Sequence, residues 1–168
     1  MKQLLLMRHA KSSWAEGGMP DFDRPLNKRG KRVAPKMASF LIEQQSTPEM
    51  IISSPAARAA ATANLVSETI GGAEPVPIRF EPQFYHAPAQ EYLKAMATAD
   101  IATISRLMFV GHNPGLEDLV DSLTGNWEIL STAAVVQLQF EADCWKEISP
   151  KFECQLLNIW RPKEIGID

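Results

Sequence analysis

Short, wholly apolar runs alternate along this chain with longer stretches of helical character, and this alternation constrains the fold more than any other feature. Residues 4–7, 50–52 and 107–110 each have the composition of a strand that is buried on both faces of a sheet. A helix-start signal or a helical period follows each run. Such alternation is typical of a mostly parallel sheet covered by helices. We therefore predict one domain, residues 1–168, with the architecture of a three-layer α/β/α sandwich.

Capping residues and apolar periodicity predict where the helices lie. Asn27 has a side chain suited to a helix N-cap, and Pro35 in the same stretch predicts either a kink or a later helix start. Ser54 followed by Pro55 is a second helix-start signal, and Pro114 opens another helix. The predicted helices span residues 27–45, 55–70, 89–99 and 114–123.

The last third of the chain is rich in β-forming residues. Residues 133–140 and 154–160 have the composition of strands, with turn-like and polar residues and no helix signal between them. Two strands joined in this way suit an antiparallel pair. Together with residues 76–80, which are strand-like despite their prolines, they predict a mostly parallel, mixed sheet with an antiparallel pair at one edge.

The composition excludes several classes of function. The 17 Lys and Arg residues are outnumbered by 20 Asp and Glu residues, for a formal charge of -3, so we expect no nucleic-acid partner and no membrane surface as partner. No apolar run approaches the roughly 20 residues of a membrane span, and the first run is too short for a signal-peptide core. Cys144 and Cys154 do not make a disulfide framework, so we expect them to be unpaired and the protein to be cytoplasmic.

Polar residues follow each predicted parallel strand at its carboxyl end, which is where ligands collect in an open α/β sheet. In chain order these are Arg8 and His9, then Ser53, Ser54 and Arg58, then Glu81, then Gly111 and His112. Guanidinium groups are permanently charged, bidentate donors, and helix N-termini add backbone donors, so this rim suits a phosphoryl group. The sequence therefore predicts a pocket for phosphate or another anion.

The histidines add reactivity to this anion site. A neutral imidazole at His9 is a competent nucleophile toward phosphorus, because an unperturbed histidine pKa of ~6.5 leaves it largely neutral at pH 7. An anion in the pocket is expected to keep His112 protonated, so that it stabilises developing charge. Glu81 is a candidate general acid or base. No Gly-rich loop with a lysine indicates nucleotide chemistry, and no metal-ligand spacing links the histidines, so we expect no metal.

Four motifs resemble those of the histidine phosphatase superfamily, also called phosphoglycerate-mutase-like. They are LLLMRHAKSSW, DRPLNKRG, ISSPAARAAATA and FVGHNPGLEDLV, which occur in the family's order between residues 4 and 123. The match is to its short branch, the SixA-type phosphohistidine phosphatases. The resemblance implies a phosphoglycerate-mutase-like fold, no metal or organic cofactor, and His9 as a nucleophile that passes through a phosphohistidine intermediate. It also implies a phosphate pocket made by His9 with Arg8, Arg58 and His112.

The resemblance leaves the proton donor open. Glu81 lies roughly where many family members have a donor, whereas Asp21 and Asp23, in the loop after the first strand, are alternatives within the SixA-type branch. Asn113 follows His112 at the position where the acid-phosphatase branch has Asp. This difference argues against a donor there and leaves Asn113 as a substrate-binding candidate.

Several positions near these motifs admit more than one interpretation. Ala10 replaces the family's usual Gly and is small enough to permit close approach. Ala15 stands where many mutase-type members have a phosphate-binding Asn, so Ser12 is the candidate replacement donor. The basic run 28–32 is either a solvated helical turn or a docking site for an acidic partner. His86 is either an exposed loop residue or part of the pocket rim.

Chain length distinguishes the branches of this family. The stretches on either side of Glu81, from Arg58 and up to His112, are short, whereas family mutases and bisphosphatases have extra helices that close over a small substrate. We therefore predict no lid subdomain and an open pocket, which favours a phosphohistidine-bearing protein as the substrate. The alternatives are a small-molecule phosphomonoesterase of the same fold and a non-catalytic module that binds phosphoproteins.

Overall fold

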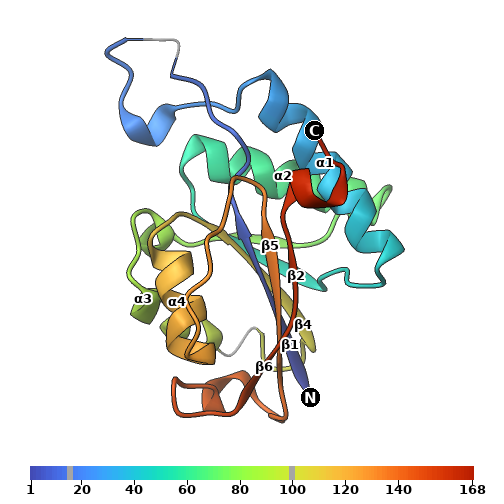
Figure 1. Ribbon diagram of the computed structural model, residues 1–168, viewed down its shortest axis with the longest axis vertical. Coiled ribbons are helices and arrows are strands. Elements are labelled where there is room, and N and C mark those ends of the chain that lie inside the picture. The colour runs from blue at the N-terminus through green and yellow to red at the C-terminus, as the bar shows by residue number, and fades with distance from the viewer. Residues whose placement is uncertain (15–16, 99–100) are drawn as a thin grey trace.

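The computed structural model describes residues 1–14, 17–98 and 101–168 of the chain (Figure 1). These residues form a six-stranded sheet with the order β3-β2-β4-β1-β5-β6. Strands β3, β2, β4 and β1 run parallel to one another, while β5 runs antiparallel to both β1 and β6. The prediction of a mostly parallel, mixed sheet with an antiparallel pair at one edge is confirmed. The strands are β1 (Lys2–Arg8), β2 (Met50–Ser53), β3 (Ile78–Phe80), β4 (Arg106–Gly111), β5 (Val135–Phe140) and β6 (Cys154–Trp160).

Helices cover both faces of this sheet and give the predicted three layers. They are α1 (Lys28–Glu43), α2 (Ala57–Gly71), α3 (Ala89–Met96) and α4 (Gly115–Thr124). Figure 1 shows α1 and α2 on one side of the sheet and α3 and α4 on the other. Side chains of β1 alternate between two cores, because successive residues of a strand point to opposite faces. Leu5 and Met7 belong to the core under α1 and α2, and Leu4 and Leu6 to the core under α3 and α4.

Helix α2 and strand β3 are among the elements that begin later than their sequence signals predicted. Helix α2 starts at Ala57 instead of Pro55. The Ser54 hydroxyl oxygen accepts a hydrogen bond from the Ala56 N–H at 3.2 Å, which holds a turn ahead of the helix. Strand β3 starts at Ile78 because the prolines before it have no N–H to donate to a ladder.

The first turn of α1 packs tightly against the loop that leaves β1. The predicted N-cap is confirmed, since the Asn27 side chain accepts the Gly30 N–H at 2.8 Å, and the helix continues through Pro35 without a later start. The Asn27 N–H in turn donates to the carbonyl oxygen of Lys11 at 3.0 Å. A Cβ atom at Gly30 would lie 2.2 Å from that same oxygen, so only glycine permits the contact.

The connections around the carboxyl ends of the strands are short. Between β3 and β4 the longest described helix is α3, of eight residues, so the described chain has no helical lid subdomain there. Short 3-10 helices lie in several connections, namely η1 (Asp21–Asp23), η2 (Pro82–Phe84), η4 (Trp145–Glu147) and η5 (Pro162–Ile165). The predicted end of the third helix at residue 99 lies outside the described residues. None of the described helices has the length and apolarity needed to cross a membrane.

Candidate active site

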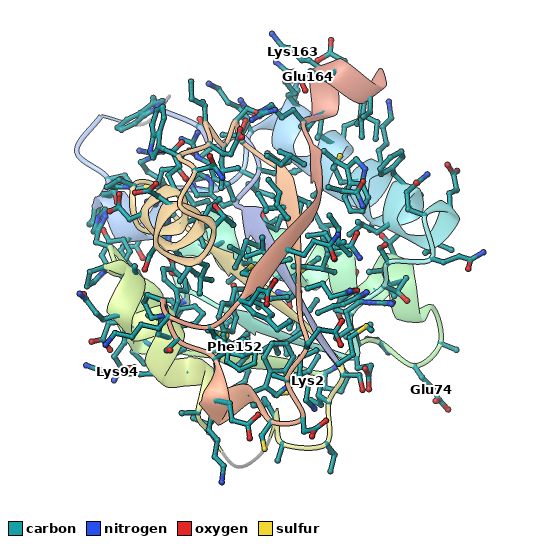
Figure 2. The ribbon with its side chains drawn as sticks, turned by 60° about the horizontal axis from the view of Figure 1, so that its bottom comes forward. Lys2, Glu74, Lys94, Phe152, Lys163 and Glu164 are labelled. Carbon is teal, nitrogen blue, oxygen red and sulfur yellow. The ribbon has the colours of Figure 1, made fainter. Side chains whose placement is uncertain are left out.

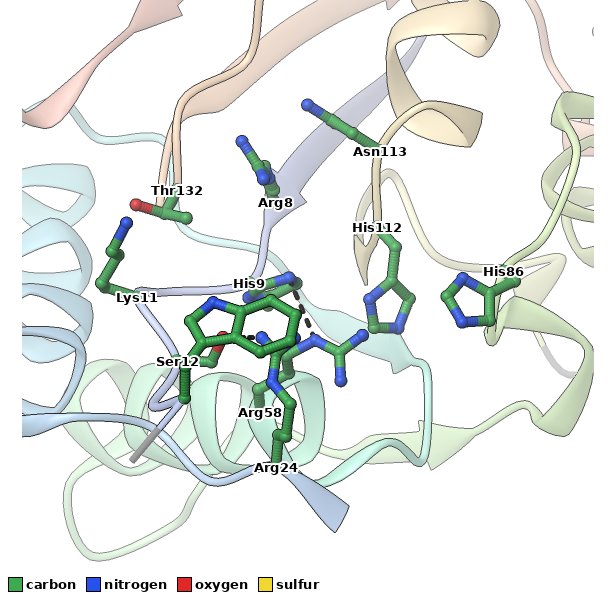
Figure 3. A pocket seen from close by; sticks show the side chains of 11 residues that line it. Arg8, His9, Lys11, Ser12, Arg24, Arg58, His86, His112, Asn113 and Thr132 are labelled. Atoms are coloured by element: carbon green, nitrogen blue, oxygen red, sulfur yellow. Dashed lines mark hydrogen bonds between the residues drawn. The ribbon is translucent and has the colours of Figure 1, made fainter. Parts of the chain in front are cut away.

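The carboxyl ends of β1, β2 and β4 meet at one edge of the sheet. The His9 N–H donates to the Gly111 carbonyl at 3.1 Å, and the Ser54 N–H donates to the Val110 carbonyl at 3.0 Å, so the residues after these strands are neighbours. A pocket of about 220 Å³ opens there (Figure 3). The predicted nucleophile and all the predicted anion-binding residues line it, whereas the candidate proton donors Glu81, Asp21 and Asp23 do not. The lining consists of Arg8, His9, Lys11, Ser12, Trp14, Arg24, Arg58, His86, His112, Asn113 and Thr132.

His9 is 7% exposed, and both of its ring nitrogens have hydrogen-bond partners. Its Nδ1 lies 2.7 Å from the carbonyl oxygen of Ala10, which can only accept, so Nδ1 carries the proton. The unprotonated Nε2 accepts a hydrogen bond from Arg58 Nε at 3.2 Å. Burial and the nearby arginine charges lower the pKa of His9 to about 4, although the Ala10 carbonyl opposes them. His9 is therefore neutral at pH 7, with its lone pair on Nε2.

His112 lies beside His9, with 5.2 Å between the two ring centroids. Its Nε2 is 2.8 Å from Ser54 Oγ, which already accepts the N–H of Ala56, so the Ser54 hydroxyl proton is available to His112. This arrangement leaves the proton of a neutral His112 on Nδ1, a buried atom that has no hydrogen-bond partner among the described residues. Burial, followed by the charges of His9 and Arg58, lowers the pKa of His112 to about 3. The His112 ring is thus neutral at pH 7 in the pocket without an anion. The protonated ring was predicted for a pocket that holds an anion, where the negative charge of a phosphate dianion would raise the pKa of His112.

Arg8 and Asn113 share one carbonyl group on the loop before β5. Arg8 Nη1 donates to the Leu130 carbonyl at 2.8 Å, while Arg8 Nε is buried and has no partner among the described residues. The Asn113 side-chain nitrogen donates to the same carbonyl at 2.9 Å and to Glu117 Oε1 at 2.7 Å. Both N–H groups of Asn113 are then engaged, and only its acceptor oxygen remains unpartnered. The two N–H groups of Asn113 thus hold this loop, and its predicted role in substrate binding stays a prediction.

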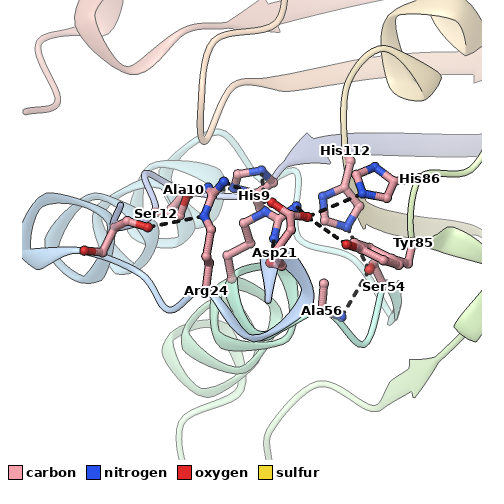
Figure 4. Close-up of polar contacts among 12 residues, drawn as sticks. His9, Ala10, Ser12, Asp21, Arg24, Ser54, Ala56, Tyr85, His86 and His112 are labelled. Carbon is pink, nitrogen blue, oxygen red and sulfur yellow. Dashed lines mark hydrogen bonds and ion pairs between the residues drawn. The ribbon is translucent and has the colours of Figure 1, made fainter. Parts of the chain in front are cut away.

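Asp21 joins four side chains above the pocket (Figure 4). Its Oδ2 accepts the Tyr85 hydroxyl at 2.8 Å and Arg58 Nη2 at 3.0 Å, and its main-chain oxygen accepts Arg58 Nη1 at 2.7 Å. Arg24 Nη1 donates to Oδ1 at 3.0 Å, and His86 Nε2 lies 3.4 Å from Oδ2. Burial raises the pKa of Asp21, but the hydrogen bonds from Tyr85 and Arg58 outweigh it and lower the pKa to about 2. Asp21 is therefore a carboxylate at pH 7 that occupies Arg58 donors.

Arg24 and Trp14 also line the pocket, and neither was predicted as a site residue. Arg24 is 8% exposed, donates through Nη2 to Ser12 Oγ, and packs 3.3 Å from the centroid of the Trp14 ring. Trp14 itself is 77% exposed and forms an open wall. Ser12, the predicted donor, keeps its hydroxyl proton because its oxygen accepts from Arg24. Ala15, in the same loop, lies outside the described residues.

Glu81 does not reach the pocket. Strand β3 is the edge strand of the sheet, separated from β4 and β1 by β2, so its carboxyl end is the most distant of the four parallel strands from His9. The Glu81 carboxylate lies 3.8 Å from Arg79 Nε. Asp23 is exposed and does not line the pocket either. Of the three candidate proton donors, only Asp21 contacts the side chains around His9.

The pocket has the electrostatic character of an oxyanion site. The described residues of its lining include the cations Arg8, Lys11, Arg24 and Arg58 and no carboxylate. Clustered guanidinium groups suit the geometry of a phosphoryl group. Across the described ranges, no group of three or more His, Cys, Asp or Glu side chains is arranged to hold a metal ion. The site can thus bind a tetrahedral oxyanion and present a neutral imidazole to it.

Comparison with known proteins adds a family context. Residues 4–103 match the histidine phosphatase superfamily (branch 1). An uncharacterized chloroplastic protein of Arabidopsis thaliana is 34% identical to this chain over 155 residues, which is 87% of this chain and 70% of that protein.

Solved structures share the fold. The candidate phosphohistidine phosphatase SixA of Agrobacterium tumefaciens superposes with a TM-score of 0.79 at 26% identity, over 96% of this chain and 98% of that one. The corresponding candidate from Nakamurella multipartitia superposes with a TM-score of 0.81 at 21% identity, over 96% of each chain. The predicted α/β fold is confirmed by these similarities.

Proposed function

The chain belongs to the histidine phosphatase superfamily (branch 1), and from that membership we propose that it is a phosphatase with His9 as its nucleophile. The substrate that we propose is a phosphohistidine on a partner protein. The proposed reaction requires neither a metal nor an organic cofactor, because side chains of the pocket supply both the nucleophile and the donors that stabilise charge.

One observation carries this proposal: an unprotonated ring nitrogen lies among buried N–H donors. His9 Nε2 is 3.2 Å from Arg58 Nε, while His112 Nδ1 and Arg8 Nε are buried without partners among the described residues. A buried donor left unpaired costs about 1–3 kcal/mol. A bound phosphoryl group would satisfy these donors and bring phosphorus next to Nε2.

In the proposed reaction, the phosphoryl oxygens accept N–H groups from Arg8, Arg58 and His112. His9 Nε2 attacks phosphorus and forms a P–N bond, while the bond to the substrate's imidazole breaks and its electron pair returns to that ring, which takes up a proton. Water then attacks the phosphoryl group on His9 and loses a proton, the P–Nε2 bond breaks, and inorganic phosphate leaves. Fixed guanidinium donors around the equatorial oxygens would stabilise the transition state of both steps.

The ionised state of Asp21 and the position of Glu81 favour a phosphoramidate over an alkyl phosphate as the substrate. An alkoxide leaving group needs a strong proton donor, but Asp21 is ionised and Glu81 faces Arg79. An imidazole, with an ordinary pKa of ~6.5 for its protonated form, departs far more readily. The exposed wall at Trp14 also leaves the pocket accessible to a side chain on a protein surface. The name of the A. tumefaciens relative supports the same substrate class.

Two peptides of identical sequence, one with phosphohistidine and one with phosphoserine at the same position, test the substrate class. We expect kcat/KM for the phosphohistidine peptide to be higher by about a hundredfold or more, the usual contribution of a missing general acid. The His9→Asn variant, similar in size, is expected to lose turnover of both peptides. Comparable rates on the two peptides would indicate the phosphomonoesterase alternative. Tight binding of the phosphohistidine peptide without turnover by the native protein would indicate a non-catalytic module.

We also propose the cytoplasm as the compartment, on the basis of composition. The A. thaliana relative is chloroplastic, so the compartment proposed for this chain differs from that of the relative. Cell fractionation with an antibody to this chain tests the proposal, and recovery in an organelle fraction would contradict it.

A further inference from the structure

A second cavity, of about 440 Å³, adjoins the His9 pocket. Three residues, Arg8, Lys11 and Thr132, line both cavities, so the two lie side by side. In Figure 3, Lys11 and Thr132 lie on the side of His9 opposite to His86, and this is the side toward which the second cavity extends. We call it the basic cavity, defined by its lining residues Arg8, Lys11, Arg29, Ser131, Thr132, Arg161, Pro162, Lys163 and Glu164.

Segments far apart in the sequence build the basic cavity. The first turn of α1 contributes Arg29, and the close contact of Gly30 with the Lys11 carbonyl oxygen holds this turn beside the loop after β1. Helix η5 contributes Lys163, and Figure 1 shows this C-terminal segment, in red, beside α1. The loop before β5 forms the remaining wall. The cavity is therefore part of the fold and not the surface of one flexible segment.

Some cations of the basic cavity are already neutralised. Arg161 Nη2 pairs with Glu128 at 2.9 Å and its Nη1 with Glu164 at 3.4 Å. Arg29 Nη2 pairs with Asp168 at 2.7 Å. The Asp168 side chain is 75% exposed, and an exposed pair of this kind contributes only about 0–1 kcal/mol, so a ligand can compete for Arg29.

Other cations of the lining have no such partner. Arg8, Lys11 and Lys163 form no ion pair with any residue in the described parts of the chain. Lys163 projects at one end of the molecule in Figure 2, next to Glu164, which is the only carboxylate among the described residues of the lining. Positive charge therefore exceeds negative charge among the described lining residues of a cavity that adjoins the phosphate pocket. Such a cavity attracts and holds anions.

We propose that the basic cavity is a subsite for a second anionic group of the substrate, a carboxylate or a phosphate, while the phosphoryl group lies against His9. Arg8 and Lys11, which line both cavities, bridge the two anionic groups. In a protein substrate the second group is an acidic side chain near the phosphohistidine, and in a small molecule it is a carboxylate or phosphate of the same molecule. The proposal rests on the proposed function, and it gives Arg29 of the basic run 28–32 a role in substrate selection.

Two matched substrate pairs test the subsite and identify the source of the anion. The first pair consists of phosphohistidine peptides with Asp or with Asn on both sides of the phosphorylated residue. The second pair is 3-phosphoglycerate and glycerol 3-phosphate, which differ by one carboxylate. In at least one pair we expect the more anionic member to have a kcat/KM roughly tenfold higher, as two exposed charge contacts would give. The pair that shows the preference identifies a protein or a small molecule as the source.

The Arg29→Gln/Lys163→Gln double variant removes two cations that line the basic cavity but not the His9 pocket. We expect it to lose this preference while keeping the rate on the less anionic member. The Lys146→Gln/Lys151→Gln variant changes the net charge equally and is the control, since Phe152, next to Lys151 in sequence, lies far from Lys163 (Figure 2). The control is expected to keep the preference. No preference in either pair, or an equal loss in both double variants, would overturn the proposal.

A binding measurement separates this proposal from the catalytic one. In the His9→Asn background, which is not expected to turn over substrate, calorimetric titration with the same two pairs reports affinity alone. A tighter Kd for the more anionic member, lost on adding Arg29→Gln/Lys163→Gln, supports the subsite even if native turnover is absent and the catalytic proposal fails. Equal Kd values within both pairs overturn the subsite even if turnover is normal.

Discussion

The two sides of the His9 pocket differ in how their side chains are held. On the sheet side, His9 and His112 are 7% and 4% exposed and directly follow strands, with Arg8 paired opposite Gly111 in the β-ladder. On the loop side, Trp14 is mostly exposed, and Asp21 and Arg24 are fixed by contacts between side chains. Backbone register thus determines the positions of the reacting groups. On the loop side, contacts between side chains determine the positions of the residues that surround the reacting groups.

This difference indicates how substitutions on the two sides should act. Changes on the sheet side are expected to alter proton affinity and the rate of the chemical steps, because the buried rings carry the reacting nitrogens. Changes on the loop side are expected to alter anion affinity and substrate preference by smaller factors, since the contacts there are more exposed and screened by solvent.

The largest expected effect is on the proton affinity of the buried histidines. In an NMR titration, we expect the His9 midpoint at about 4 and the His112 midpoint at about 3, against ~6.5 for an unfolded chain. The folded protein favours the neutral rings, so the unfolded chain takes up more protons as pH falls below 6.5, and the free energy of unfolding decreases from there toward pH 4. Saturating inorganic phosphate is expected to raise both midpoints. Midpoints near 6.5 without phosphate would contradict the burial that distinguishes the sheet side.

A second effect on the sheet side comes from Ser54, which positions His112. Ser54→Ala removes the hydroxyl next to His112 Nε2, and we expect kcat to fall roughly tenfold, the equivalent of one lost hydrogen bond. Ser54→Thr, which keeps a hydroxyl, is expected to recover part of the loss. Nitrogen-15 NMR of His112 should show the Nδ1–H tautomer in the native protein and a mixture in Ser54→Ala. An unchanged tautomer together with an unchanged kcat would exclude the positioning role.

On the loop side, Asp21→Asn is expected to strengthen phosphate binding. The Asp21 carboxylate occupies one donor of Arg58, Nη2, and repels an incoming anion, so we expect the inhibition constant of inorganic phosphate to fall about fivefold. Asp23→Asn, with the same charge change at an exposed position in η1, is the matched control and should change little. If Asp21→Asn instead abolishes hydrolysis of the phosphoserine peptide but not of the phosphohistidine peptide, Asp21 acts as a proton donor. The loop side would then contribute directly to the chemical step, as the sheet side does.

The smallest effect is expected for Glu81→Gln. Because Glu81 faces Arg79 at the edge strand and does not line the pocket, kcat/KM should change less than about twofold on both phosphohistidine and phosphoserine peptides. A selective loss on the phosphoserine peptide would show that Glu81 moves into the pocket when substrate binds.

The contrast between the sheet side and the loop side also explains how much of the site could be predicted from the sequence. Arg8, His9 and His112 were predicted because apolar runs identify strands, and the residue after a strand has a known place at the sheet edge. The cap at Asn27 is likewise a local signal. The position of Glu81 away from the pocket could not be predicted, because the order of strands across the sheet, which puts β3 at the edge, is not encoded in any local pattern.

Long-range contacts account for the remaining residues. Arg24 enters the pocket only because the loop after β1 folds back, with Ser12 bridging Leu26 and accepting from Arg24. Lys163 joins the basic cavity because β6 returns to the side of α1, about 130 residues after Arg29. Neither residue follows a parallel strand or lies on a periodic face. Arg24 lies within the motif DRPLNKRG, but that resemblance did not assign it a role in the pocket.

The central claim, that His9 becomes covalently phosphorylated, is tested by trapping the intermediate. The native protein is mixed with a phosphohistidine peptide that carries labelled phosphate, quenched in alkali within milliseconds to seconds, digested, and mapped by mass spectrometry. We predict an acid-labile, alkali-stable phosphate on the peptide that contains His9, with none in His9→Asn. Absence of this label in the native protein, together with normal peptide hydrolysis by His9→Asn, would contradict the mechanism.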